Sequence, residues 1–292
     1  MKPNHLILTH ALLALGCRLH ALEYPLEPAE PQKTGWPLTP EERAYVVEKP
    51  EHERRPGREQ NKHLPRLWPR VPSAGHFGGD AWLRLHEAHI RTVQANQGPI
   101  DVLLVGDSIT IQWGESWRRH FPELKTINIG IGGDKTQNVL WRLDHGGVAG
   151  LQPRLIVLMI GNNNMFFTRE TGVEAAALGI LMCVQNLHEK FPDAEVLVTE
   201  ILPAHSPGNP VYEDIRSTNL ALLELVSQMS AVSPKVSGMS IWSDFTNADG
   251  SRKTGLFKPD HVHLSPAGYD VVAAKLKPLF AKIFALKVQS AN

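Results

Sequence analysis

From residue 80 onward, short apolar runs alternate with longer stretches of helical periodicity. Three of the runs are apolar without the alternation of a half-exposed strand, as expected for strands that are buried on both faces of a sheet. Such alternation predicts a parallel sheet covered by helices on both sides, with right-handed crossovers. The expected strands are 102–105, 126–129, 155–160, 196–201 and 240–242, and the expected helices lie near 137–143, 172–190, 212–229 and 265–286.

Four short motifs follow expected strands, at their carboxyl ends or in the loops beyond them. Ligands of open α/β sheets bind at this edge, so a shared site is expected there. The motifs are Gly106-Asp107-Ser108, Gly130-Ile131-Gly132-Gly133-Asp134, Gly161-Asn162-Asn163-Asn164 and Asp260-His261-Val262-His263.

The first motif offers a serine hydroxyl at the rim of the sheet. The N–H of Ser108 would lie at the start of a helix, where a developing negative charge is stabilised. Read alone, however, Gly-Asp-Ser more often reflects a helix capped by Asp107 than a nucleophile.

The second motif combines glycines that permit close backbone approach with Asp134, which can cap the following helix. A dinucleotide site is disfavoured, because Lys135 stands where the sixth-position glycine belongs and the motif follows the second strand rather than the first. A plain tight turn remains an alternative.

The third motif supplies asparagines, which suit turns, so a structural role is expected for two of the three. A side-chain amide aimed into the cleft would be a neutral N–H donor for an oxyanion.

The fourth motif supplies an acid and a base. A histidine base near the serine needs an acid that fixes its tautomer, and three residues separate Asp260 from His263. His261 competes for the role of base but is expected to face solvent. A His-x-His metal pair is disfavoured, because no cysteine or second acidic cluster lies nearby.

Together these motifs resemble those of the GDSL or SGNH hydrolase superfamily, and within it those of the catalytic subunits of platelet-activating-factor acetylhydrolase Ib. The resemblance runs from about residue 100 to 279 and rests on residues 105–108, 128–134, 139–143, 161–164 and 260–265. Two residues depart from the family pattern, Asn162 in place of Thr and Ile109 in place of Leu, and neither removes a catalytic atom. The Gly-x-Ser-x-Gly elbow of α/β-hydrolases is absent from the sequence.

The resemblance implies a three-layer α/β/α sandwich with a five-stranded, parallel, flavodoxin-like sheet. It implies Ser108 as the nucleophile, Asp260 as the orienting acid and His263 as the base. It also implies an oxyanion hole formed by the Ser108 N–H, the Gly133 N–H and the Asn163 side chain.

The function expected from this set is a serine esterase that removes a short acyl group, most plausibly acetyl, from a small molecule or a glycan. No metal or organic cofactor is expected. An acyltransferase and a catalytically silent carbohydrate-binding module remain open alternatives. Asp107, Trp113, Phe166 and His205 are candidates for substrate contact, although burial in the core is the better default for aromatic side chains.

The region before the α/β pattern divides into two further segments. Residues 1–21 are predicted to be a signal peptide, because the apolar run 6–16 after Lys2 is shorter than the ~20 residues that span a bilayer. A cut before Cys17 would permit a lipid anchor on that cysteine. Secretion or periplasmic export is therefore favoured over an apolar helix in a cytosolic protein. Residues 22–79 form a Pro/Arg-rich arm, read as an ordered wrap, and 80–292 the hydrolase domain.

The charge balance and the cysteine content limit the kinds of binding partner and disulfide that we expect. The 30 basic and 30 acidic residues cancel, and no clustered basic face suggests binding to nucleic acid. Cys17 lies at the predicted cut, which leaves Cys183 alone in the body of the chain, and Cys183 is predicted to be a buried small hydrophobe. At the start of the domain, Asp80 is expected to cap a helix whose buried face carries Trp82, Leu85, His89, Ile90 and Val93.

Overall fold

The computed structural model describes residues 79–167 and 172–284. Five parallel strands form one sheet in the order β2-β1-β3-β4-β5. This is the doubly wound, flavodoxin-like order, so the predicted fold class is confirmed. The strands are β1 (Gly98–Gly106), β2 (Thr126–Asn128), β3 (Leu151–Met159), β4 (Glu195–Thr199) and β5 (Val236–Met239).

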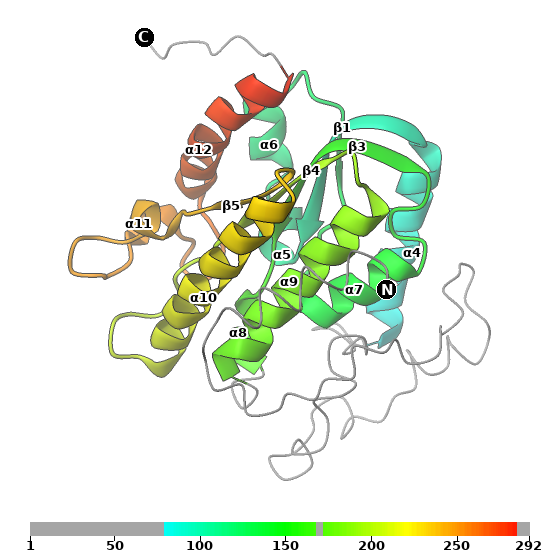
Figure 1. Cartoon of the computed structure of the whole chain (residues 1–292). Coiled ribbons are helices and arrows are strands. Elements are labelled where there is room, and N and C mark those ends of the chain that lie inside the picture. The colour runs from blue at the N-terminus through cyan, green and yellow to red at the C-terminus, as the bar shows by residue number, and fades with distance from the viewer. Residues whose placement is uncertain (1–78, 168–171, 285–292) are drawn as a thin grey trace.

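Helices cover both faces of the sheet, giving three layers (Figure 1). The helices α7 (Thr136–Asp144), α9 (Gly172–Lys190) and α10 (Pro210–Val232) pack on one face, where α9 and α10 lie side by side. The helices α5 (Ser108–Ile111), α6 (Gly114–His120) and α12 (Pro266–Phe284) pack on the other. The remaining elements are α4 (Gly79–Ala95), α8 (Asn162–Phe167), α11 (Trp242–Phe245) and the 3-10 helix η3 (Thr254–Leu256).

The central strands supply both halves of the core. Along β1, Leu103 and Val105 belong to the core under α7, α9 and α10, whereas Val102 and Leu104 belong to the core under α5, α6 and α12. All four side chains are at most 1% exposed, and burying each contributes about 1.5–3 kcal/mol. The uniformly apolar sequence of this strand therefore follows from its having two covered faces.

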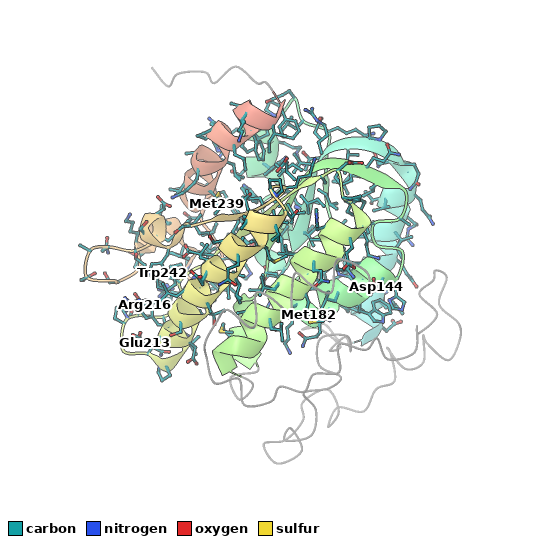
Figure 2. All side chains as sticks on the ribbon, in the orientation of Figure 1. Asp144, Met182, Glu213, Arg216, Met239 and Trp242 are labelled. Carbon is teal, nitrogen blue, oxygen red and sulfur yellow. The ribbon has the colours of Figure 1, made fainter. Side chains whose placement is uncertain are left out.

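Polar contacts tie neighbouring helices together. Asp144, at the end of α7 and labelled in Figure 2, accepts a hydrogen bond of 3.2 Å from Asn186 and pairs with Lys190 at 3.0 Å, both on α9. The first residue of α11, Trp242, packs edge-on against Tyr212 of α10 with ring centroids 5.2 Å apart. These contacts fix helices on the face opposite α12.

The fifth strand was predicted at 240–242, and this is wrong. The strand is Val236–Met239, and Trp242 begins the helix α11. The chain leaves the sheet because the Glu200 carboxylate accepts the N–H groups of Ile241 and Trp242, each at 2.7 Å. An anion at a helix start favours such a turn. Since β5 is a short edge strand, its own sequence gives little pattern.

The buried face of α4 differs in part from the prediction. Trp82, Ile90 and Val93 are buried as expected, but Leu85 is 42% exposed. Leu83 and His86 are buried in its place. Asp80 lies within the first turn and pairs with Arg84 rather than capping the helix from outside.

We expect His86 to make the fold less stable in acid. Burial, reinforced by the charge of Arg142, lowers the pKa of His86 from 6.5 to about 3. Between these values the unfolded chain binds a proton that the folded protein does not. The free energy of unfolding therefore falls as pH decreases, by about 1.4 kcal/mol per pH unit.

The variant His86→Gln keeps an N–H that can donate to the His145 carbonyl, 2.9 Å from the His86 ring in the native protein, but it does not titrate. We expect the free energy of unfolding of this variant, measured in urea between about pH 7 and about pH 4.5, to fall less steeply with decreasing pH than that of wild type. The difference in slope should correspond to the binding of about one proton. His89, whose pKa burial lowers to about 4, contributes to both proteins alike. Parallel curves for wild type and variant would refute the assignment.

Several expectations fall on parts of the chain outside the described residues. The predicted signal peptide, its cut before Cys17 and the arm up to residue 78 are among them. Within the described ranges, no helix is long and apolar enough to cross a membrane. Cys183 is buried in α9, as predicted.

Candidate active site

A tight connection between β1 and α5 presents Ser108 at the carboxyl end of the sheet. Asp107 is the N-cap of α5, and its Oδ1 accepts the Ile109 N–H at 2.9 Å. A Cβ added at Gly106 would lie 2.1 Å from the Met159 carbonyl oxygen, so only glycine fits between β1 and the end of β3. The tripeptide therefore serves both of its expected purposes, since Asp107 caps the helix while Ser108 remains partly exposed.

Ser108, His263 and Asp260 form a continuous hydrogen-bonded line. Ser108 Oγ lies 2.8 Å from His263 Nε2, and His263 Nδ1 lies 2.8 Å from Asp260 Oδ2. Since an ionised carboxylate can only accept, the His263 Nδ1 carries a proton and Nε2 is left to accept the serine hydroxyl. The predicted nucleophile, base and acid are thus brought together from positions 155 residues apart.

Asp260 is held as an anion by its own loop. Partial burial alone would raise its pKa, but the N–H groups of Val262 and His263, each 2.9 Å from Oδ1, together with the His263 ring, lower the pKa of Asp260 to about 2. The carboxylate consequently stays ionised at any pH at which His263 can act as a base.

The segment around Asp260 is braced on both sides. Lys258 N–H donates to the His263 carbonyl at 2.8 Å, and Arg252 Nη1 donates to the His261 carbonyl at 2.5 Å. His261 has a left-handed φ of 62° and is exposed. Of the two competing histidines, His263 therefore contacts the serine.

The glycine loop, residues 129–135 between β2 and α7, closely approaches the turn of residues 106–108 that carries Ser108, called the serine turn below. A Cβ added at Gly130 would lie 2.6 Å from the Ile111 backbone nitrogen. Gly133 has a left-handed φ of 81°, a conformation that glycine adopts without strain. Close packing explains the first of these glycines, and backbone conformation explains the second.

Asp134 does not cap α7, so that prediction is wrong. Lys135 is the N-cap residue. The fully buried Asp134 carboxylate pairs instead with Arg142, whose Nε and Nη2 lie 2.8 and 2.6 Å from Oδ2. Arg142, 1% exposed, also donates from Nη1 to the Ile129 carbonyl at 2.8 Å. One guanidinium thereby fastens both ends of the glycine loop.

The Asn163 side chain bridges the serine turn and the glycine loop. Its Nδ2 donates to the Asp134 carbonyl at 2.9 Å and to Asp107 Oδ2 at 3.3 Å. Asn164 and Asn162 are buried and bond to the backbone, at Thr136 N–H and the Leu202 carbonyl. Asn162 and Asn164 are therefore structural, as expected for two of the three asparagines. Asn163 lies beside Asp134, which follows Gly133, and beside Asp107, which precedes Ser108.

Asp107 and Trp113, both candidates for substrate contact, are each 1% exposed and so are not available for direct contact. Burial, followed by the nearby charge of Asp134, raises the pKa of Asp107 to about 7. The Trp113 ring stacks on Tyr269 with centroids 5.8 Å apart, and the Tyr269 hydroxyl donates to the Ile109 carbonyl at 2.7 Å. Both residues support the serine turn from the core.

The other two candidates for substrate contact lie on loops or short elements at the same edge. His205 is exposed in the segment between β4 and α10, with a φ of 62°. Phe166 is in α8, and its side chain is outside what the structure describes. The part of the chain that is described contains no group of three or more His, Cys, Asp or Glu side chains arranged to hold a metal.

Two residues at this site had no role in the sequence-based prediction. Arg142 lies in a helix whose other residues up to Leu143 are also buried, and a charge in such a setting is a signal of a buried ion pair. Trp82 donates its indole N–H to Asp134 Oδ1 at 2.7 Å from a helix more than 50 positions earlier, and nothing local in the sequence indicates that contact.

This arrangement has the components of acyl transfer. A serine hydroxyl lies against a histidine that is oriented by an ionised carboxylate, which is the geometry of an activated nucleophile. An amide side chain and a glycine-rich backbone lie next to it, where N–H groups can stabilise an oxyanion.

The sequence matches a known family over the segment that holds these residues. Residues 104–271 match the family model described as the GDSL-like lipase/acylhydrolase family. Platelet-activating factor acetylhydrolase IB subunit alpha1 of Homo sapiens is 34% identical over 212 residues, which cover 71% of this chain and 86% of that protein.

Solved structures share the fold. A GDSL-like lipase from Bacteroides thetaiotaomicron superposes with a TM-score of 0.53 at 21% identity, covering 69% of this chain and 98% of that one. An acetyl xylan esterase superposes with a TM-score of 0.50 at 21% identity, covering 62% of this chain and 99% of that one. At this level of identity, the two solved structures support the fold of this chain and nothing beyond it.

Proposed function

Because the chain belongs to the GDSL-like lipase/acylhydrolase family, we propose that it is a serine esterase that hydrolyses short-chain acyl esters, acetyl esters above all. The observation that carries the proposal is the line of two 2.8 Å contacts from Ser108 through His263 to Asp260. The substrate class is an acyl ester of a small molecule or a glycan.

The reaction follows from the proton positions. His263 Nε2 takes the Ser108 proton as Oγ attacks the acyl carbon, while Asp260 stabilises the imidazolium. The oxyanion accepts hydrogen bonds from the N–H groups of Ser108 and Gly133 and from the Asn163 amide. His263 then protonates the leaving alcohol, and the acyl group remains on Ser108. In the second half, His263 activates water, which releases the acid and restores the serine.

The preference for a short acyl group rests on analogy. The human relative that is 34% identical is named an acetylhydrolase. Fold alone does not fix a substrate, because members of one fold carry different pockets.

Acyl length is the quantity that tests the proposal. With p-nitrophenyl esters of acetate, butyrate and octanoate, we expect kcat/KM to be highest for acetate and to fall at least about tenfold by octanoate, since a pocket that fits a small group excludes a longer one by steric cost. Initial rates of p-nitrophenolate release, measured at several concentrations of each ester, give the three values.

Three results would contradict it. A higher kcat/KM for octanoate would reject the short-acyl preference while leaving the esterase. Absence of turnover on all three esters, together with absence of Ser108 labelling by a fluorophosphonate, would favour the binding-module alternative. Acyl transfer to an added polyol in preference to water would favour an acyltransferase.

A further inference from the structure

We propose that Trp82 of α4 is a positioning residue for the oxyanion hole, acting through Asp134 on Asn163 and the backbone of Gly133. This inference rests on the proposed esterase function. Trp82 lies before the segment 104–271 that matches the family model, and it touches none of the three residues of the Ser108–His263–Asp260 line in the contacts described above.

The contact between Trp82 and Asp134 is short, buried and directional. The indole Nε1 donates to Asp134 Oδ1 at 2.7 Å, and both side chains are 0% exposed. Arg142 occupies the other carboxylate oxygen, Oδ2, at 2.8 Å from Nε. The two donors approach different oxygens, so together they fix the rotation of the carboxylate, which neither fixes alone.

Apolar packing holds the indole in place. Trp82 forms a small buried cluster with Leu83, Ile131 and Trp141, and its ring centroid is 5.3 Å from that of Trp141 on α7. Ile131 belongs to the glycine loop itself. In Figure 1, α4 (cyan) lies next to α7. The helix therefore contacts the loop through both an apolar and a polar interaction.

Asp134 transmits this position to the expected oxyanion donors. Its carbonyl accepts the Asn163 Nδ2 at 2.9 Å, so a shift of Asp134 moves the amide. Gly133 is its immediate chain neighbour and has a φ of 81°, so the same shift turns the peptide that carries the Gly133 N–H. Donors of an oxyanion hole depend on precise placement, and a small misplacement far from the chemistry can cost up to about 100-fold in rate.

A double-mutant cycle with Asn163 tests the inference. Trp82→Phe keeps an aromatic ring in the cluster but removes the N–H, and we expect kcat on p-nitrophenyl acetate to fall about tenfold with KM unchanged. In an Asn163→Ala background, from which the donor is already gone, the same substitution should lower kcat less than about threefold. If Trp82 had a role in folding alone, the substitution would lower kcat by the same factor in both backgrounds.

Trp117→Phe is the matched control. Trp117 is 3% exposed and donates its Nε1 to Thr126 Oγ1 at 2.9 Å, so this variant also loses one indole hydrogen bond, partly buried and on the α12 side of the sheet. We expect its kcat to stay within about twofold of wild type. All assays run below the thermal unfolding midpoint of each variant.

Two outcomes overturn the inference: an unchanged kcat in Trp82→Phe, or an equal loss with and without Asn163. If Trp82→Phe does not fold, 3-benzothienylalanine at position 82, which replaces only the N–H by sulfur, is read in the same cycle with the same outcomes. Should wild type itself lack ester turnover, the proposed function fails separately, and the rate of Ser108 labelling by a fluorophosphonate replaces kcat in the cycle.

Discussion

Replacing Ser108 with alanine is expected to lower kcat for p-nitrophenyl acetate by at least about 10⁴-fold. In the proposed mechanism, the hydroxyl whose oxygen lies 2.8 Å from His263 Nε2 is the attacking group, so its loss would remove the covalent route altogether. Any residual rate would come from water attacking an ester bound next to the Asn163 amide and the glycine loop. The measurement is the initial rate with equal concentrations of folded wild type and variant.

Ser116→Ala controls for the loss of a serine nearby. Ser116 lies on α6, is 8% exposed and accepts a hydrogen bond of 3.3 Å from Arg119, and it has no part in the proposed chemistry. Its kcat should match wild type within about twofold. A Ser108→Ala variant as active as wild type would refute the proposed mechanism itself.

Replacing Arg142 with methionine is expected to destabilise the protein by about 3–5 kcal/mol. Met keeps much of the apolar volume, but among the described residues it leaves the Asp134 carboxylate, 0% exposed, with the Trp82 indole as its one side-chain donor. The substitution also removes the 2.8 Å bond to the Ile129 carbonyl. The free energy of unfolding from urea titration at neutral pH measures the loss.

Lys275→Met is the matched control, since it removes an ion pair of similar length from the surface. Lys275 Nζ lies 2.5 Å from Asp244 Oδ2, but the two side chains are 37% and 32% exposed. Solvent screens such a pair, so we expect a loss of at most about 1 kcal/mol. Equal losses in the free energy of unfolding for the two variants would show that the buried Arg142–Asp134 pair stabilises the protein no more than an exposed pair does.

Much of the architecture was predictable because its causes are local in the sequence. The apolar runs of β1, β3 and β4 predict strands covered on both faces, and these three are the inner strands of the sheet. Once a parallel sheet is expected, the motifs that follow its strands must gather at one edge. That rule predicts a shared site for the four motifs, and the resemblance to the hydrolase family implies Ser108, Asn163 and His263 as the residues within them.

Three of the errors have a different origin, since each concerns a side-chain contact that the local sequence pattern does not show. The chain leaves β5 at Met239 because Glu200, at the end of β4, accepts the next N–H groups. Asp134 has the residue type and the position of a helix cap. Its carboxylate instead accepts hydrogen bonds from a guanidinium eight residues later and an indole 52 residues earlier. Trp113 is an aromatic near Ser108, and its ring contacts with Trp117 and with Tyr269 of α12 place it in the core.

The sequence by itself therefore determined the fold class, the edge of the sheet that carries the site and the residue types able to perform acyl transfer, because periodicity and strand-end position are properties of the chain alone. The tertiary structure decided which partners the Asp134 carboxylate takes, where the chain leaves β5 and which side chains hold the glycine loop. These depend on distances of about 3 Å between residues far apart in the chain, over which hydrogen-bond direction and burial, not sequence spacing, select the partner.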